Sequence, residues 1–281
     1  MNSIKKMMLS GALGCLISGM AYADGSSPQP VKPYWQDIQV VAVNKEKPRS
    51  SFMSYADRET ALTSRFEKSP YYSLLNGTWK FFFVDSYKDL PQNITDPSVN
   101  TSSWDDITVP GNWEVQGHGV AIYTNHGYEF KPRNPQPPLL PEANPVGVYR
   151  RDIEIPASWD NRDIYLHIGG AKSGLYVYLN GKEVGYSEDS KNPAEFLINK
   201  YLQPGKNVLT LKIFRWSTGS YLECQDFWRM SGIERDVFLW SQPKANIQDF
   251  RVVSTLDDTY TNGIFNWYSE CEFLYPADSH L

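Results

Sequence analysis

Two adjacent acidic residues are the first side chains in this sequence that could do chemistry. Glu188 and Asp189 follow one another, and a pair of carboxyl groups can serve as acid and base. Neighbouring residues on one strand, however, point to opposite faces of a sheet. We therefore reject the two residues as a catalytic pair and expect them to lie in a solvated turn.

Histidine and cysteine give no metal-binding pattern. No two of the four histidines are spaced i, i+4 as zinc ligands on a helix are; they are His118, His126, His167 and His280. His167 lies in an alternating stretch and is predicted to pack against a sheet. Cys224 and Cys271 have no His or second Cys at metal-ligand spacing, so we expect no zinc site. An exported protein could form one disulfide between these two cysteines, but we expect both thiols to be unpaired and structural.

The elements that must position such residues are predicted to be short strands. Aromatic residues make up 14% of the chain, and they favour strands. Asn180-Gly181 lies between two alternating stretches, which is a strong hairpin signal. The predicted strands cover 78–84, 148–155, 163–168, 175–179, 182–186, 207–216 and 235–240, and one short helix is predicted within 57–68. Many short strands with frequent turns predict an all-β protein, a β-sandwich of the jelly-roll type.

The two ends of the sequence differ from this central region. Lys5 and Lys6, an apolar stretch over 7–20 and Ala21-Tyr22-Ala23 have the layout of a secretory signal peptide. We expect a signal peptide over 1–23 and a leader over 24–33, in preference to a buried N-terminal helix or a lipoprotein modified at Cys15. Export to the periplasm or secretion follows from that expectation.

A new strand is predicted to begin near residue 247, after the sandwich over 34–243. One strand or hairpin cannot complete a sandwich domain, which needs about seven strands and 100 residues. We therefore expect 244–281 to be an incomplete immunoglobulin-like second domain, a strand pair with an aperiodic tail after Phe265.

Composition excludes two classes of partner. The formal net charge of the 281 residues is −5, whereas nucleic-acid binders need a basic field. No run of 18 apolar residues is present, so we expect no integral membrane span.

Four motifs, in this order, resemble one family. They are VPGNW at 109–113, IYTN at 122–125, GYSEDSKNPAEF at 185–196 and RWSTGSYLECQDFWRMSGI at 215–233. Together they resemble the N-terminal sugar-binding domain of the glycoside hydrolase family 2 β-galactosidases, over roughly residues 34–265. The YTN and DFWRMSGI stretches favour β-galactosidase over the related β-glucuronidases and β-mannosidases.

The resemblance implies a sugar site at Asn125 and Asp226. In the family, the matching residues contact sugar hydroxyls, and the aspartate also helps to hold a sodium ion together with the catalytic barrel. A hydroxyl both donates and accepts, so an amide and a carboxylate can satisfy it as a pair. Without the family, Asn125 would be a turn residue and Asp226 a solvated loop acid. Trp113, Trp216 and Trp228 could stack on sugar rings, but we expect each to be buried by packing.

The resemblance also implies what this sequence lacks. Retaining glycosidases need two carboxyl groups about 5–5.5 Å apart, and in this family both belong to glutamates on a TIM barrel, as do most magnesium ligands. Nothing after Pro243 supplies a barrel, which needs about 200 residues. We therefore expect no catalytic residue and no cofactor in this chain, and Mg and Na only in a full-length family enzyme. The expected product is a truncated or frameshifted β-galactosidase fragment. Two alternatives stay open: a free-standing carbohydrate-binding module and a fragment that complements a barrel-containing partner.

Overall fold

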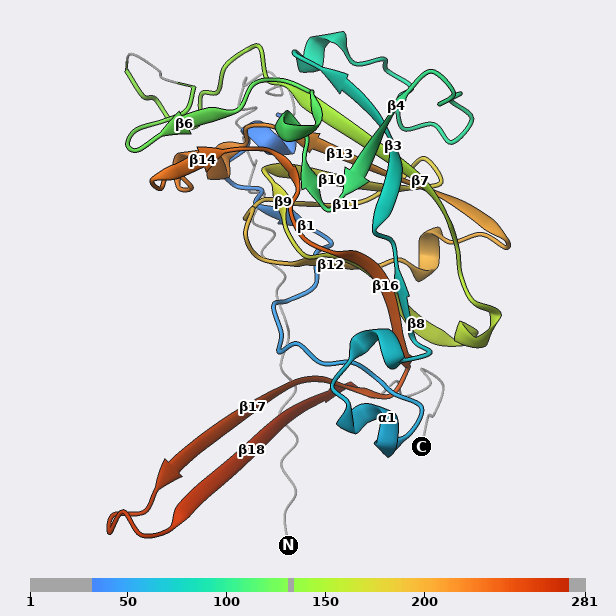
Figure 1. Ribbon diagram of the computed structural model, residues 1–281, viewed down its shortest axis with the longest axis vertical. Coiled ribbons are helices and arrows are strands. Elements are labelled where there is room, and N and C mark those ends of the chain that lie inside the picture. The colour runs from blue at the N-terminus through green and yellow to red at the C-terminus, as the bar shows by residue number, and fades with distance from the viewer. Residues whose placement is uncertain (1–31, 131–133, 273–281) are drawn as a thin grey trace, which may run out of the picture. The chain divides into compact units, whose positions relative to one another are not determined.

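The computed structural model describes residues 32–130 and 134–272. The whole predicted signal peptide over 1–23, residues 24–31 of the predicted leader, His280 and the last part of the predicted tail therefore lie outside the described residues. We describe the unit that begins at Pro33. Nearly all of its regular structure is β, as predicted from the sequence (Figure 1).

The larger sheet has seven strands in the order β1-β11-β10-β13-β7-β3-β4, and every neighbouring pair is antiparallel. The strands are β1 Ala42–Val43, β3 Gly77–Val84, β4 Asp105–Val109, β7 Val146–Glu154, β10 Gly174–Leu179, β11 Lys182–Ser187 and β13 Lys206–Phe214. Asn180 and Gly181 connect β10 to β11, both with positive φ (53° and 77°). That conformation suits Asn and Gly, so the predicted hairpin is confirmed.

The smaller sheet has four antiparallel strands in the order β12-β8-β16-β2. Its strands are β2 Tyr72–Leu74, β8 Arg162–Ile168, β12 Ala194–Leu197 and β16 Val237–Pro243. The two sheets share one apolar core, to which Phe81 and Val177 contribute from the larger sheet and Leu166 and Leu239 from the smaller. A fully buried side chain of this kind contributes roughly 1.5–3 kcal/mol, so the shared core holds the sandwich together. The predicted β-sandwich is confirmed.

The larger sheet is buried on its second face as well. Val146 and Val148 of β7 pack with Trp35 and Phe214 on that side, whereas Tyr149 of β7 belongs to the shared core. Burial on both faces explains why β7 carries apolar residues at successive positions rather than at alternate ones. The segment that begins at Tyr34 is therefore part of the packed domain.

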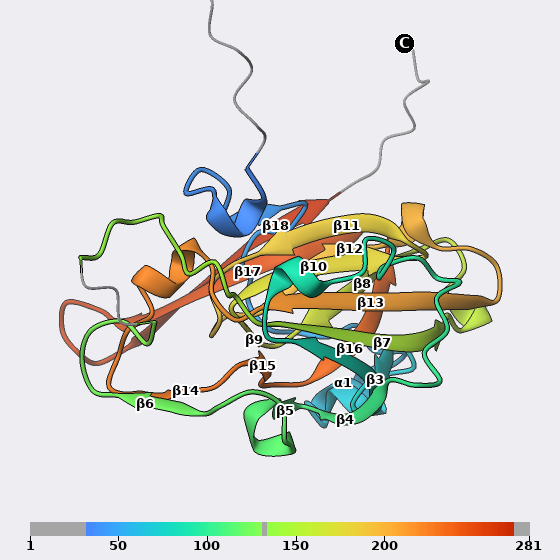
Figure 2. The ribbon, with the colours of Figure 1, turned by 90° about the horizontal axis from the view of Figure 1, so that it is seen from above.

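Three further small sheets complete the described structure. The strands are β5 Gly111–Asn112, β9 Ala171–Lys172 and β15 Gly232–Ile233 in one sheet, β6 Ile122–Thr124 and β14 Phe227–Arg229 in the second, and β17 Asn246–Leu256 and β18 Gly263–Glu272 in the third. Figure 2 shows β6 and β14 side by side.

Helical structure is confined to short segments. Helix α1 spans Arg58–Leu62, and its N-cap Asp57 accepts a hydrogen bond from the Thr60 backbone N–H at 2.7 Å. A side-chain cap of this type satisfies a donor that the first turn leaves unpaired. The 3-10 helices are Tyr34–Gln36, Phe66–Lys68, Tyr87–Asp89, Glu114–Gln116, Ala157–Trp159, Asn199–Tyr201 and Thr218–Tyr221.

The hairpin of β17 and β18 differs from the expected C-terminal region in one respect. The sequence loses its alternation from Asn266, yet β18 continues to Glu272 and pairs with β17 along its length. Alternation marks a strand only where one face is buried, and the side chains of this hairpin are largely exposed. The aperiodic sequence was therefore a poor guide to where the strand ends.

Candidate sugar-binding site

The pairing of β6 with β14 brings two of the sequence motifs together. Thr124 lies opposite Phe227 and Tyr123 opposite Trp228 in the antiparallel register. Asn125 directly follows Thr124, and Asp226 directly precedes Phe227. The two predicted site residues thus flank the same end of one ladder.

Side-chain alternation divides this strand pair into two faces. Tyr123, Asn125, Asp226 and Trp228 occupy positions that share one side of the pleat, and all four residues are exposed. Thr124 and Phe227, which share the other side, are half-buried, and Arg229 opposite Ile122 is 1% exposed. The predicted site residues therefore lie on the outer face, accessible to a ligand.

The polar groups of the outer face are oriented by short hydrogen bonds. The Tyr123 hydroxyl donates to Asp226 Oδ1 at 2.8 Å. That hydrogen bond and the nearby carboxylate charge raise the pKa of Tyr123, so the phenol stays protonated as the donor. Asn125 Oδ1 lies 2.7 Å from His126 Nδ1, a contact that uses the amide oxygen and not the amide nitrogen. Neither contact uses the Asn125 amide nitrogen or Asp226 Oδ2, so the outer face keeps an amide N–H donor and a carboxylate acceptor.

The three tryptophans singled out in the sequence fall into two groups. Trp113 and Trp216 are 0% and 8% exposed, so the predicted burial of both is confirmed. Trp228 is 53% exposed, and its ring centroid lies 5.7 Å from that of Tyr123. The predicted burial of Trp228 was wrong because its side chain lies on the outer face of a two-stranded sheet.

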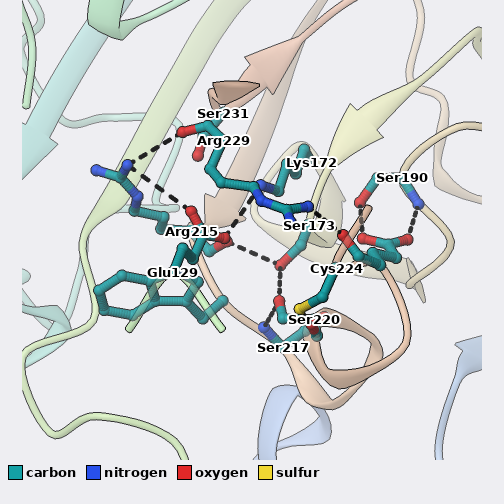
Figure 3. Close-up of polar contacts among 12 residues, drawn as sticks. Glu129, Lys172, Ser173, Ser190, Arg215, Ser217, Ser220, Cys224, Arg229 and Ser231 are labelled. Atoms are coloured by element: carbon teal, nitrogen blue, oxygen red, sulfur yellow. Dashed lines mark hydrogen bonds and ion pairs between the residues drawn. The ribbon is translucent and has the colours of Figure 1, made fainter. Parts of the chain in front are cut away.

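A cluster of buried charges holds both segments against the sandwich (Figure 3). Glu129, four residues beyond Asn125, accepts a hydrogen bond from Lys172 Nζ at 3.0 Å, and both side chains are 3% exposed. Arg215 Nη2 lies 4.0 Å from Glu129 Oε2 and 3.7 Å from Glu114 Oε1. Charges this deeply buried are stable only when they are paired, so the cluster fixes the chain beyond β6 to β9 and to the end of β13.

The chain around β14 is fixed in the same region. Arg229 donates from Nη1 to the Glu223 carbonyl at 2.7 Å, and Arg215 Nη2 donates to the Arg229 carbonyl at 3.2 Å. The Ser231 backbone N–H donates to Glu114 Oε2 at 2.8 Å. Burial raises the pKa of Glu114, since its neighbours compensate only partly for lost hydration. None of these charged residues was singled out from the sequence, because nothing in their spacing shows that they meet.

The adjacent acids rejected from the sequence are separated by burial. Glu188 is 4% exposed and accepts hydrogen bonds from Tyr186 Oη at 2.7 Å and Thr218 Oγ1 at 2.8 Å. Asp189 is exposed. β11 ends at Ser187 and Asp189 has a positive φ of 75°, so the alternation of one strand does not apply to these two residues. The expected solvated turn was wrong for Glu188, whose carboxylate is held inside the domain.

His167 lies on the smaller sheet and not near β6 and β14. Its ring stacks on Phe238 with centroids 4.2 Å apart, and Nδ1 lies 2.8 Å from Glu195 Oε1. The predicted sheet packing of His167 is confirmed. Its side chain also borders a cavity of about 330 Å³ that neither Asn125 nor Asp226 lines.

Metal-binding and membrane features were also searched over the described residues. Within 32–130 and 134–272, no three His, Cys, Asp or Glu side chains are grouped so that they could hold a metal ion. Cys224 and Cys271 are free thiols. The same part of the chain contains no helix with the length and apolar character that crossing a membrane requires.

The family is settled by a sequence match. The family described as "Glycosyl hydrolases family 2, sugar binding domain" matches residues 72–243, which include β6, β14 and the buried charge cluster. The chain belongs to this family. Residues 72–243 of this family 2 sugar-binding domain run from the first to the last residue of the smaller sheet.

Curated relatives of this sugar-binding domain are β-galactosidases. The chain is 41% identical over 234 residues to one from Priestia megaterium, with 82% of this chain and 23% of the relative covered. It is 38% identical over 232 residues to one from Psychromonas ingrahamii, with 83% and 22% covered. The chain thus spans less than a quarter of the length of these relatives.

Solved structures support the fold. A β-glycosidase from Bacteroides vulgatus superposes with a TM-score of 0.54 at 23% identity, over 73% of this chain and 24% of that one. A β-glucuronidase from Ruminococcus gnavus gives a TM-score of 0.56 at 20% identity, over 73% and 34%. At these identities the likeness shows the fold of the sugar-binding domain and nothing of its ligand.

Proposed function

We propose that this chain binds terminal β-D-galactosides as the sugar-binding part of an exported β-galactosidase, with Asn125 and Asp226 as the residues that contact the sugar. The observation that carries the proposal is their placement: 101 positions apart in sequence, they flank the same end of the β6–β14 ladder on its outer face. The motifs that contain them resemble those of β-galactosidases, and the curated relatives bear that name.

The chemistry of the pair fits a sugar hydroxyl. Asp226 accepts a hydrogen bond and Asn125 donates one, which together satisfy a group that is both donor and acceptor. A site built to pair with one hydroxyl rejects the epimer that points this hydroxyl elsewhere, because the protein groups are then left unpaired. We propose that the pair distinguishes galactose from glucose in this way.

In this proposal, the two glutamates that carry out hydrolysis lie on the barrel of a full-length enzyme. The same holds for magnesium, whose ligands we assign to the barrel of a full-length enzyme. The Asp226 carboxylate is a suitable ligand type for sodium, since carboxylate oxygens bind hard cations. Its Oδ1 already accepts from Tyr123, so Asp226 would supply one ligand and the barrel the others. The purified chain is accordingly expected to leave a chromogenic β-galactoside uncleaved.

A titration of the purified chain tests the binding proposal. Methyl β-D-galactoside and its C4 epimer, methyl β-D-glucoside, are added while backbone and side-chain N–H signals are followed by NMR. We expect weak binding of the galactoside that Asn125→Ala and Asp226→Ala each weaken about tenfold, as expected for loss of a hydrogen bond to a polar or charged group. Asp258→Ala, in the exposed turn of the β17–β18 hairpin, is the control and is expected to change nothing. Equal affinity for both sugars, or no effect of either site variant, would contradict the proposal.

Export has its own test. The full sequence with a C-terminal tag is expressed in a Gram-negative host, and the N-terminus of the product is sequenced. We expect the periplasmic product to begin at Asp24. A cytoplasmic product with an intact N-terminus would contradict export.

A further inference from the structure

The cavity beside His167 lies on the outer face of the smaller sheet, apart from the proposed sugar site. Its volume is about 330 Å³, and neither Asn125 nor Asp226 lines it. Small organic ligands usually bind in cavities of about 300 Å³ or more that combine apolar walls with a few polar groups. A dry apolar cavity of about 150 Å³ is enough to hold benzene, so this one can hold a ligand with a single ring.

Strand register brings the polar wall of this cavity together. His167 of β8 lies opposite Glu195 of β12 on one side and opposite Phe238 of β16 on the other. The chain neighbour Leu166 belongs to the core shared by the two sheets, so these three side chains point to the opposite face by alternation. Residues 45–53, which contain no helix or strand, also line the cavity.

The hydrogen bonds of Glu195 determine which ring nitrogen of His167 carries a hydrogen. Glu195 Oε1 lies 2.8 Å from His167 Nδ1, and Arg49 donates to the two carboxylate oxygens at 3.0 and 3.2 Å. Burial opposes ionisation, but the His167 hydrogen bond and the Arg49 charge keep the pKa of Glu195 below its ordinary value. An ionised carboxylate only accepts, so Nδ1 carries the hydrogen and Nε2 of the neutral ring is an acceptor.

That acceptor is available to a ligand. The His167 side chain is 18% exposed and lines the cavity, and within 32–130 and 134–272 no residue hydrogen-bonds to Nε2. The ring is held in place by Glu195 and by stacking on Phe238, with centroids 4.2 Å apart. A group that is already oriented loses little entropy when a ligand binds.

The remaining walls favour a neutral, apolar ligand. Apolar surface comes from Phe52, Met53 and Phe66 together with Phe238. The charged residues that line the cavity are three cations and three anions, namely Lys45, Lys47, Arg49, Glu46, Asp189 and Glu195. Because the two signs balance, the cavity has no net field that would concentrate an ion of either sign. A flat apolar ring with one hydrogen-bond donor matches these walls.

We propose that this cavity binds a phenol, a neutral single-ring aromatic compound whose O–H donates to His167 Nε2. The ring of the ligand would lie against the aromatic side chains of Phe52 and Phe66, since aromatic rings pack favourably on one another. The inference is independent of the proposed function, because Asn125 and Asp226 take no part in it.

NMR titration of the full chain with four single-ring probes tests the proposal: phenol, anisole, benzoate and benzylammonium. Anisole keeps the ring and the oxygen of phenol but has no donor. We expect phenol to bind with a Kd of about 1 mM, a modest affinity for so small a ligand, and the other three probes to bind at least fivefold more weakly. Bound phenol should shift the Nε2 resonance of His167 and leave the Nδ1 resonance nearly unchanged.

Three variants place the binding in this cavity. His167→Phe keeps a ring beside Phe238 but removes the acceptor, so it should weaken phenol at least fivefold and leave anisole unchanged. Ser51→Trp adds a large side chain at an exposed position of the lining and should abolish binding of phenol. His118→Phe is the matched control, since His118 also contacts a phenylalanine ring, with centroids 4.8 Å apart from Phe81, but does not line the cavity. It should change no affinity.

The outcomes separate this cavity from the sugar site. Equal affinity for phenol and anisole, or phenol binding that survives Ser51→Trp, would overturn the proposal. Tighter binding of benzoate or benzylammonium than of phenol would show an ion site and overturn it as well. Asp226→Ala should leave phenol binding unchanged, and Ser51→Trp should leave galactoside binding unchanged. If the wild type binds galactoside but no phenol, only the cavity proposal falls.

Discussion

The described residues contain two separate two-stranded sheets, one supported by buried contacts and one largely exposed to solvent. The β6–β14 pair has three paired positions, yet its inner face is joined to the sandwich through Arg229 and the cluster of Glu129, Lys172 and Arg215. The β17–β18 hairpin has ten paired positions, and successive residues such as Val252 and Val253 are both about 40% exposed. Since successive residues point to opposite faces, both faces of this hairpin meet solvent.

The comparison shows which contacts stabilise each of the two strand pairs. A two-stranded hairpin alone is at best marginally stable in water, so length does not make β17–β18 rigid. The described contacts of its base include Ser50, whose N–H donates to Asp249 Oδ1 at 2.8 Å and whose Oγ donates to the Phe250 carbonyl at 2.7 Å. The short pair, by contrast, takes its geometry from buried charges beneath it. The side chains of the proposed site are therefore held in position by contacts with the sandwich rather than by the β6–β14 pair itself.

The largest effect is expected from removing one charge beneath the short pair. Lys172→Met leaves Glu129 buried without its closest partner, and breaking a buried pair in this way costs about 3–5 kcal/mol. Urea unfolding measures the loss. Lys206→Met, which removes the exposed ion pair with Asp152 (side chains 62% and 55% exposed), is the control and should cost about 0–1 kcal/mol. A loss below about 1 kcal/mol for Lys172→Met would show that the cluster does not hold the site.

A smaller effect is expected from removing the long hairpin. A chain that ends at Lys244 keeps the Lys244–Asp163 ion pair but loses the two hydrogen bonds to Ser50. Each is worth about 1 kcal/mol, so the free energy of unfolding of this chain should fall by about 2 kcal/mol. Its solubility should rise, because an exposed strand edge promotes association. Light scattering and urea unfolding check both quantities. A loss as large as that of Lys172→Met would mean that the hairpin supports the sandwich as strongly as the buried charges do.

The smallest effects concern pH, and the two sheets should respond with opposite sign. Burial beneath the short pair raises the pKa of Glu114 above its ordinary 4.5, so the folded state binds the extra proton. Its contribution to stability is then largest below pH 4.5 and is lost as the pH rises through the raised pKa. The backbone N–H of Ser50 lowers the pKa of Asp249 below its ordinary 3.8. Its contribution is present above pH 3.8 and is lost as the pH falls through the lowered pKa.

Unfolding free energies measured from pH 3 to pH 8 separate the two groups. Relative to the wild type, Glu114→Gln should gain stability as the pH rises, because the amide carries no charge to bury. Asp249→Asn should lose stability in the same direction, since the wild type gains its ionised carboxylate there. The same sign for both variants would contradict the pKa directions.

The sandwich could be predicted from the sequence because its strands and turns have local signals in residue type and spacing. Alternating residue types over 163–168 and 175–179 predict strands, and Asn180-Gly181 predicts a tight reversal. The structure confirms both strands and the turn, although most residues of β8 and β10 are buried rather than every second one. The β6–β14 pair could not be found in this way. Three residues are too few to show a period, and the partner strand lies about 100 positions away. Only the family resemblance predicted that Asn125 and Asp226 belong to the same site.

The sequence also did not predict which single charged side chains are buried. Glu188, Glu129 and Lys172 are all charged residues that sequence patterns assign to the surface. Each is buried because a specific partner from a distant segment meets it, as Thr218 meets Glu188. Such partners depend on the assembled topology and leave no local signal. Trp228 shows the converse error, since a large aromatic residue suggests the core.

The long separation between the two halves of the proposed site also has a kinetic consequence. Tyr123 and Asp226 are 103 positions apart, and β7, β8, β10, β11, β12 and β13 all lie between them in the chain. Closing so large a loop costs conformational entropy, which is offset only once the intervening strands have folded and brought the two segments close. Contacts of this range therefore form late and slowly. Under the proposed function, galactoside affinity would then appear only at the end of refolding, and the sugar would report when the last long-range pairing has formed.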